Sequence, residues 1–141
     1  MFFPVKIQEV DPGQFLATCR FIPECTFVAK SHDEAVDLAA QAVPGTLELC
    51  YRRKKKSIPL PDGTLHEGEI RAYVPIKVQL KIALWNIACD RKMNLSVLAR
   101  TLHITPTQAQ RLVDLSIDKA STESIEAALS SLGVHHTVIS D

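Results

Sequence analysis

The side chains best suited to recognising a ligand are concentrated in one stretch, 95–114, which has the sequence LSVLARTLHITPTQAQRLVD. Glutamine and arginine make paired hydrogen bonds to adenine and guanine edges in the major groove of DNA, and threonine hydroxyls bind backbone phosphates. The second half of the stretch holds these residue types at Thr105, Thr107, Gln108, Gln110 and Arg111. The pattern therefore predicts that these side chains contact DNA bases and phosphates.

Positioning such side chains requires a helix, and the stretch predicts two short helices joined by a tight turn, the helix-turn-helix of many DNA-binding proteins. Thr105 is a good N-cap and Pro106 suits the first helical position, so the second helix has a defined start. Apolar residues at helical spacing would face inward: Leu98, Ala99, Leu102, Ala109 and Leu112. The opposite face of the second helix would then present the polar set to solvent, and Asp114 with it.

The turn between the two helices falls at His103, where glycine is usual because the residue commonly has a positive φ. Histidine adopts that conformation at some cost. Two short helices joined by a turn also occur in all-α domains that never bind DNA, and this alternative stays open. The spacing and the outward polar set favour DNA binding.

The charge balance restricts how the chain could bind DNA. Its 141 residues hold 16 Lys and Arg against 16 Asp and Glu, a formal net charge of +0. Since affinity for DNA depends on cations that neutralise phosphates, binding must rely on a local patch and on a homodimer or higher homo-oligomer. We expect residues 134–139 to form a strand that pairs across a two-fold axis, and the operator to be an inverted repeat.

Several other classes of protein are disfavoured. No apolar run approaches the ~20 residues that span a bilayer, and the N-terminus MFFPVKIQEV lacks the features of a signal peptide. We therefore expect a cytoplasmic protein with no membrane partner. The cysteines form no CxxC pair and have no histidine at zinc-ligand spacing: Cys19, Cys25, Cys50 and Cys89. We expect scattered core thiols, no metal site and no cofactor.

Hydrophobic patterning divides the chain into two units and predicts an α+β fold. Residues 1–75 predict a β-β-β-α-β unit with strands at 2–10, 15–21, 26–29 and 69–74. Residues 76–141 predict an all-α unit that ends in the short terminal strand. Its helices are a long amphipathic one over 77–92, the helix-turn-helix, and a last helix capped by Ser121 and stopped by Gly133.

One helix is expected to cover the N-terminal sheet. Ser31 opens it, and Glu34 three residues later completes a capping box. Its buried stripe would consist of Ala35, Val36, Leu38, Ala39, Ala42 and Val43. Pro44–Gly45 should kink or split the helix, because proline cannot donate to the carbonyl of Ala40. The basic run 52–56 that follows is favoured as a solvated helix end, with a nucleic-acid patch as the alternative.

Short motifs along nearly the whole chain resemble those of HicB-type antitoxins that carry a Cro/C1-like DNA-binding domain. They are Phe3-Pro4-Val5, Asp11-Pro12-Gly13, Phe15-Leu16-Ala17, Ile22-Pro23-Glu24-Cys25, Ser31-His32-Asp33-Glu34-Ala35, Ile58-Pro59-Leu60-Pro61 and Tyr73-Val74-Pro75. The resemblance implies a degenerate RNase H-like N-terminal domain that binds and neutralises HicA, a small mRNA-cleaving toxin. It also implies that the C-terminal domain represses the operon by binding its operator.

A toxin that binds RNA should be basic, so its inhibitor should present acidic side chains together with apolar anchors. The N-terminal unit offers Glu24, Asp33 and Asp37 near the third strand and the start of the helix. Glu34 lies nearby, but its role as a cap explains it better. We expect the three acids to attract the toxin by electrostatic complementarity, whereas the basic run 52–56 has the wrong sign for this partner.

Catalysis on an RNase H-like sheet would need several carboxylates that converge on divalent metals. The expected strands offer Glu9 and Glu69, and the helix offers Asp33 and Asp37 near its N-terminus, where anions are stabilised in any case. No nucleophile stands beside a base, and we expect no catalytic residues and no enzyme. Two alternatives stay open: a small metal-dependent nuclease with a regulatory domain, and a transcription regulator whose N-terminal domain senses a small molecule.

Overall fold

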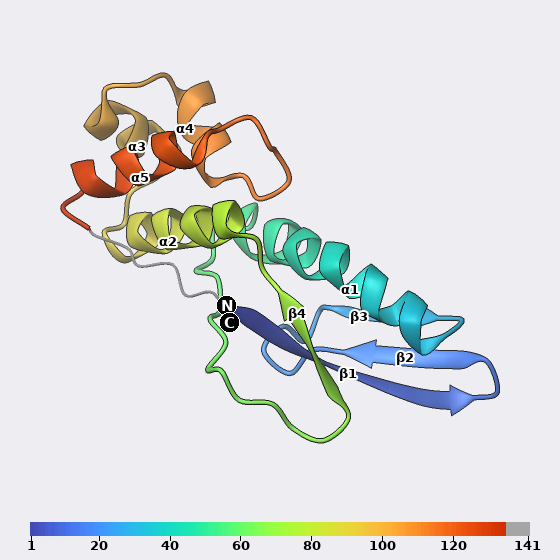
Figure 1. Cartoon of the computed structure of the whole chain (residues 1–141). Helices are drawn as coiled ribbons and strands as arrows, with labels where there is room; N and C mark the ends of the chain where they lie inside the picture. Colours follow the sequence, from blue (N-terminus) through green and yellow to red (C-terminus); the bar gives the residue numbers. More distant parts are fainter. Residues whose placement is uncertain (135–141) are drawn as a thin grey trace.

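The computed structural model describes residues 1–134, so the terminal strand expected at 134–139 lies, from His135 onward, outside the described residues. Figure 1 shows a four-stranded sheet with one long helix on its face, followed by a group of helices beyond one end of that sheet. The architecture is α+β, as predicted.

All neighbouring strands of the sheet are antiparallel, in the order β3-β2-β1-β4. The strands are β1 (Phe2–Asp11), β2 (Gln14–Thr18), β3 (Thr26–Ala29) and β4 (Glu69–Tyr73). Side chains alternate between the two faces of a strand, and Phe3, Val5 and Ile7 of β1 are buried while Lys6 is exposed. Gly13, at φ +75°, closes the β1–β2 hairpin in a conformation that glycine adopts without steric cost.

The second strand is shorter than the 15–21 expected from the alternating pattern. β2 ends at Thr18, and the chain then makes two tight turns. The N–H of Ile22 donates to the Cys19 carbonyl at 3.1 Å, and the N–H of Cys25 donates to the Ile22 carbonyl at 2.9 Å. These three side chains are buried, so the apolar residues beyond the strand reach the core through turns.

The helix over the sheet, α1 (His32–Leu47), begins as predicted, because the Ser31 side chain accepts a hydrogen bond from the N–H of Glu34. The Glu34 carboxylate instead accepts from the N–H of Lys30 at 2.8 Å, one residue further back than the expected capping box. The buried stripe is narrower than expected and repeats every four residues, at Ala35, Ala39, Val43 and Leu47. Val36 and Leu38, predicted to be buried, are 36% and 37% exposed.

The expected split at Pro44–Gly45 is wrong. The helix continues through both residues to Leu47 and passes directly into a π-helical turn, η1 (Glu48–Arg52). Proline does remove the hydrogen bond to the Ala40 carbonyl, but Ala40 is exposed, so solvent can satisfy that group. Val43 and Leu47, on either side of Pro44, are both packed in the core and hold the two segments in one helix.

Four helices follow β4: α2 (Ile76–Asp90), α3 (Leu95–Leu102), α4 (Pro106–Val113) and α5 (Thr122–Ser131). α2 packs against α4 and α5, and the indole N–H of its Trp85 donates to the Lys56 carbonyl at 2.8 Å. Asn86 of the same helix exchanges two hydrogen bonds with the backbone of Ile58, at 2.7 and 3.0 Å. α2 therefore contacts both halves of the chain, and the boundary between residues 75 and 76 stays a prediction.

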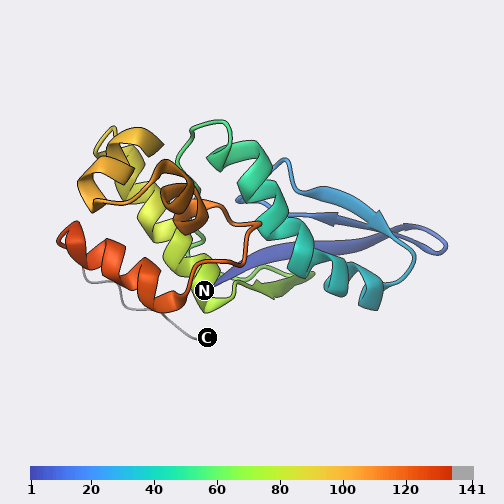
Figure 2. The same ribbon diagram turned by 90° about the horizontal axis from the view of Figure 1, so that it is seen from above.

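The hydrophobic core is continuous between the two halves. Buried apolar side chains from the sheet, α1, α2 and α5 belong to one cluster, which includes Phe3, Leu47, Leu84 and Leu129. Figure 2 shows α1 running along the sheet towards α2–α5, which lie beyond its end. None of the helices within residues 1–134 combines the length and the apolar character needed to cross a membrane.

Candidate functional site

α3 and α4 are two short helices joined by a tight turn, at the residues where the sequence predicted them. His103 makes the turn in the left-handed conformation, with φ +58° and ψ +43°. The N–H of Ile104 donates to the Ala99 carbonyl at 3.0 Å, and the N–H of His103 donates to the Arg100 carbonyl at 3.2 Å. This pair of bonds is the Schellman pattern, which satisfies the last carbonyls of α3 and fixes the exit of the chain towards α4.

The start of α4 is fixed by a reciprocal cap. The Thr105 side chain accepts from the N–H of Gln108 at 3.1 Å, and the Gln108 side-chain oxygen accepts from the N–H of Thr105 at 2.9 Å. Pro106 occupies the first helical position, as predicted. Because its oxygen already accepts one bond within the cap, Gln108 keeps its amide N–H₂ fully available to a ligand.

The five predicted DNA contacts are all exposed, whereas Ala109, Leu112 and Val113 are buried against the rest of the chain. With 3.6 residues per turn, Thr107 and Arg111 lie at the centre of the exposed face of α4. Gln108 and Gln110 are about 200° apart around the helix and lie on its two flanks. The structure therefore brings the candidates onto one helix but gives the two glutamines different surroundings.

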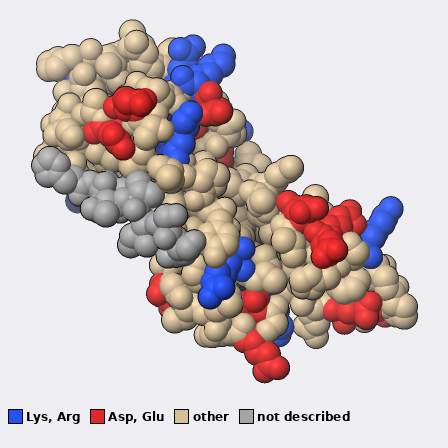
Figure 3. Space-filling view, viewed as in Figure 1, with Lys and Arg blue, Asp and Glu red and all other residues tan. Residues whose placement is uncertain are grey.

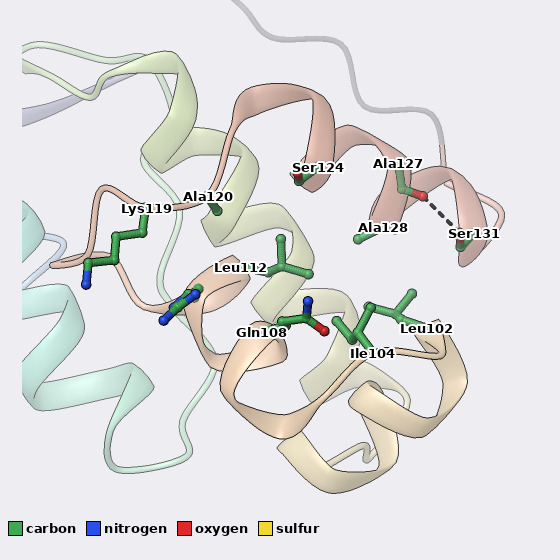
Figure 4. Close-up of a pocket in the computed structure, with 11 residues that line it drawn as sticks. Leu102, Ile104, Gln108, Leu112, Lys119, Ala120, Ser124, Ala127, Ala128 and Ser131 are labelled. Carbon is green, nitrogen blue, oxygen red and sulfur yellow. Dashed lines mark hydrogen bonds between the residues drawn. The ribbon is translucent and has the colours of Figure 1, made fainter.

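The flank that carries Gln108 borders a hollow of about 330 Å³ between α4 and α5. Figure 4 shows Gln108 and Leu112 of α4, with Ile104 before it, on one side, and Ser124 and Ala128 on the other. Arg111 also lines this hollow, so Gln108 and Arg111 both border the side of α4 that faces α5.

Asp114 is not outward, as the sequence predicted, but only 2% exposed. It ends α4 with an extended backbone, at φ −75° and ψ 113°. One carboxylate oxygen accepts from the N–H and the hydroxyl of Ser116, at 2.9 and 2.6 Å, and the other lies 3.6 Å from the Arg52 guanidinium. The helix stops before Asp114, and contacts with η1 draw the side chain inward.

The contacts from η1 form a buried ion-pair network that sequence reasoning missed. Glu48, 1% exposed, accepts from Arg52 at 2.6 and 2.5 Å and from Arg53 at 2.8 Å. Its carboxylate also accepts from the N–H of Leu115, directly after α4, at 2.9 Å. Arg52 is 6% exposed, so the expectation that the whole basic run stays solvated is wrong. We call Glu48, Arg52, Asp114 and Lys81 the buried junction.

Lys81 of α2 completes the buried junction. It is 1% exposed, and its ammonium donates to the carbonyl of Asp114 at 2.7 Å and to that of Ile117. Burial lowers the pKa of Lys81, and the nearby Asp114 carboxylate opposes that effect. Burial acts to raise the pKa of Asp114, but the hydrogen bonds from Ser116 and the charge of Arg52 outweigh it, so this pKa lies below its usual value.

We expect the buried junction to weaken in acid. The pKa of Asp114 is lower in the folded chain than its usual 3.8, so the carboxylate stabilises the fold above that value. This contribution is lost as the pH falls through the folded pKa. The free energy of unfolding in urea, measured from about pH 7 to about pH 3, should therefore fall less steeply in Asp114→Asn than in the parent. Parallel profiles would contradict the assignment.

The three predicted acidic contacts do not form one cluster. Asp33 and Asp37 are exposed and lie one turn apart on the first half of α1. The Glu24 carboxylate accepts from the hydroxyl of Tyr51 on η1, at 2.6 Å, beyond the far end of the 16-residue helix, which is about 24 Å long. That hydrogen bond lowers the pKa of Glu24, and burial together with the same bond raises the pKa of Tyr51 to about 12.

Apolar side chains accompany the acidic pair on α1. Val36 and Leu38, two α1 residues predicted to be buried, are found at the surface, 36% and 37% exposed. Figure 3 shows acidic side chains gathered over the start of α1 and the neighbouring end of the sheet. Asp33 and Asp37 therefore lie on a surface that offers both negative charge and apolar contacts.

Glu69, one of the carboxylates considered for catalysis, is already bound by neighbouring groups of the protein. Glu69 accepts from the Arg20 guanidinium at 2.9 Å and from the N–H of His66 at 2.6 Å. Within residues 1–134, no three His, Cys, Asp or Glu side chains are grouped so that they could hold a metal ion. The expectation that the chain has no catalytic residues stays a prediction.

Comparison with known proteins assigns a family to this arrangement. The family described as the HicB-like antitoxin of bacterial toxin–antitoxin systems matches residues 2–83, more than half of the chain. Antitoxin HicB of Pseudomonas fluorescens (strain Pf0-1) is 30% identical over 131 residues, which cover 93% of this chain and 88% of that protein. Antitoxin HicB 1 of Photorhabdus laumondii subsp. laumondii is 27% identical over 115 residues, 82% of this chain and 72% of that protein. The chain belongs to the HicB-like antitoxin family.

Proposed function

We propose that this chain neutralises a HicA-type, mRNA-cleaving toxin by binding it, and represses its own operon by binding operator DNA. Membership of the HicB-like antitoxin family carries the proposal. The structure supports it by presenting two candidate surfaces on separate elements, the acidic face of α1 and the exposed face of α4. Because inhibition by binding needs no chemical step, we propose a non-enzymatic role for this chain.

We interpret the α3–α4 pair as a Cro/C1-like helix-turn-helix with α4 as the recognition helix. Arg111, at the centre of its exposed face, would meet a base edge, Thr107 beside it would bind a phosphate, and Gln110 would reach a base or phosphate from one flank. Thr105 and Gln108, at its first turn, would lie nearest a phosphate. With a net charge of +0, one such unit should bind weakly, so we propose a homodimer on an inverted repeat with half-sites about one helical turn apart.

We interpret the N-terminal half as a degenerate RNase H-like domain whose acidic α1 face binds the toxin. Its β-β-β-α-β order, with α1 on one face of the sheet, is compatible with that interpretation. Asp33 and Asp37 would attract a basic RNA-binding protein, and the exposed Val36 and Leu38 would supply apolar contact area once the two proteins meet. Glu24 lies near the opposite end of α1, against Tyr51, and is too far from Asp33 and Asp37 to belong to the same binding surface.

Co-expression with a HicA-type toxin, which we expect to be a small basic protein, tests the antitoxin role. We expect the chain to restore growth that the small protein arrests, to co-purify with it, and to shift a DNA duplex taken from upstream of the operon. Restored growth without a complex would contradict neutralisation by binding. Metal-dependent cleavage of RNA by the purified chain alone would favour the nuclease alternative instead.

Reversing the charge of the acidic pair should slow toxin capture. In Asp33→Lys/Asp37→Lys, we expect a lower association rate constant at low salt, because long-range attraction between the exposed acids and a basic partner is lost. Stopped-flow mixing with the toxin at several ionic strengths measures the effect. The rate constants of parent and variant should converge as salt screens the charges.

The matched control is Glu123→Lys/Glu126→Lys, which makes the same change in net charge on the exposed face of α5. It should leave the association rate constant close to that of the parent. Equal slowing by both double variants would show that total charge matters rather than the α1 face. DNA binding by the Asp33→Lys/Asp37→Lys variant should be retained, since the acidic pair lies on the other half of the chain.

A further inference from the structure

A second hollow, of about 540 Å³, lies on the Gln110 flank of α4, away from α5. Three parts of the chain line it: the end of η1 and the turn after it, the second half of α2 with the turn into the start of α3, and α4 itself. Its polar lining includes Arg52, Arg53, Lys55, Lys92, Asn94 and Gln110. Figure 2 shows the segment after η1, in green, arching beside the helices. We call this surface the basic hollow.

The basic hollow carries positive charge that the protein does not neutralise. Among residues 1–134, no aspartate or glutamate lines it. Arg52 and Arg53 are bound to Glu48, but within residues 1–134 neither Lys55 nor Lys92 forms an ion pair, and both are exposed. Two unpaired lysines thus face one hollow in a chain whose net charge is +0.

The hollow has an apolar floor as well as charged walls. Trp85 is buried beneath it, and Met93 and Leu95 are half-buried at its edge. Cations around an apolar floor suit a sugar–phosphate chain, whose phosphates need positive charge while its sugars offer carbon surface. A protein partner of basic character would be repelled from this surface.

The position beside α4 decides which nucleic acid the hollow would meet. The major groove of DNA is about 12 Å wide and admits one helix, so the phosphate backbones run along the two flanks of an inserted helix. One flank of α4 faces α5, and the other, with Gln110, borders the basic hollow. A duplex read by Arg111 would therefore bring one backbone past Lys55 and Lys92.

We propose that the basic hollow binds the phosphate backbone of the DNA duplex that α4 reads, with Lys55 and Lys92 each neutralising a phosphate. This inference rests on the proposed operator binding and extends it to a segment of the N-terminal half. The basic run 52–56 is then divided in role: Arg52 holds the buried junction, and Lys55 faces the DNA. Because phosphates are the same in every sequence, the hollow adds affinity but no base preference.

The test uses Lys55→Gln/Lys92→Gln, which removes both charges and keeps flexible polar side chains. Fluorescence anisotropy would follow binding to two labelled duplexes, one from upstream of the operon and one unrelated, at several NaCl concentrations. Each lost phosphate contact should reduce the slope of log K against log salt by about 0.9, so the double variant should lose about 2. At about 0.1 M salt its Kd should rise by at least tenfold on both duplexes.

Two matched variants separate local charge from total charge. Lys6→Gln/Lys30→Gln removes two exposed lysines of the sheet half and should keep the parental slope. Lys55→Arg/Lys92→Arg keeps both charges, so its slope of log K against log salt should also equal that of the parent. An unchanged slope in Lys55→Gln/Lys92→Gln would overturn the inference.

Three further outcomes are distinguishable. If the parent binds the upstream duplex and Arg111→Ala weakens that binding while the lysine variant does not, operator binding stands and the inference fails. If the parent binds neither duplex, the proposed DNA-binding function fails, and the inference fails with it. Loss of toxin affinity with unchanged DNA affinity would assign the hollow to the protein partner and likewise overturn the inference.

Discussion

Replacing Glu48 by alanine should lower the free energy of unfolding by about 3–5 kcal/mol, because the change leaves a buried cation without its partner. Arg52 is 6% exposed, and Glu48 is its closest counter-charge, at 2.5 Å. The N–H of Leu115 loses its acceptor in the same variant. Domains of this kind are stable by about 5–15 kcal/mol, so the loss is a large fraction of the total.

Urea unfolding followed by far-UV circular dichroism measures this effect, and Glu126→Ala serves as the control. Glu126 is an exposed glutamate of α5, and its removal should change stability by no more than about 0.5 kcal/mol. If Glu48→Ala does not fold, Glu48→Gln gives the measurement, since it keeps an acceptor for Leu115 and removes only the charge. If Glu48→Ala lowered the free energy of unfolding by less than about 1 kcal/mol, the description of Arg52 as buried and dependent on Glu48 would be wrong.

Replacing Arg111 by alanine should weaken operator binding by about 1–3 kcal/mol, roughly 5- to 150-fold in Kd, if the side chain pairs with a base. Arg111 lies at the centre of the exposed face of α4, and in the described structure it forms no ion pair that would have to break first. The loss should be greater on the operator than on an unrelated duplex, because a base contact carries sequence information and a phosphate contact does not.

Arg100→Ala is the matched control for this prediction. Arg100 is an exposed arginine in the last turn of α3, so its removal makes the same change in charge without altering α4. We expect a smaller effect, equal on both duplexes. Unchanged operator affinity in a folded Gln110→Ala/Arg111→Ala variant would contradict the assignment of α4 as the recognition helix.

The features that the sequence predicted well depend on neighbouring residues. Thr105, Pro106 and Gln108 fix the start of α4 within four positions. At the end of α3, the N–H of His103 donates three positions back and the N–H of Ile104 donates five positions back. Capping and turn chemistry act over these short separations, so residue types alone were sufficient. The exposed face of α4 followed, because a helix with known ends and a known apolar side has only one polar side.

The features that the sequence predicted wrongly depend on residues far apart in the chain. The helical pattern could place Asp114 outward, but it could not show that Arg52 would lie beside it. Pro44–Gly45 was expected to kink or split a helix, and the split does not occur because the core contacts of Val43 and Leu47 outweigh one lost hydrogen bond. The basic run 52–56 was interpreted from its position at the end of a helix. Its proximity to Gln110 of α4 is a tertiary contact, which the local sequence does not reveal.

The buried junction has a consequence for transplanting the helical half into another protein. A chimera that joins α2–α5 to a foreign N-terminal domain would strip Asp114 of Arg52 and the N–H of Leu115 of Glu48. The graft would then place uncompensated polar groups at the seam, directly behind α4. Replacing Asp114 by a neutral residue, or introducing equivalents of Glu48 and Arg52 into the foreign domain, would remove this destabilisation. The smallest unit of this chain that could be transferred intact is therefore discontinuous in sequence, because it consists of the helical half together with Glu48 and Arg52, which precede it.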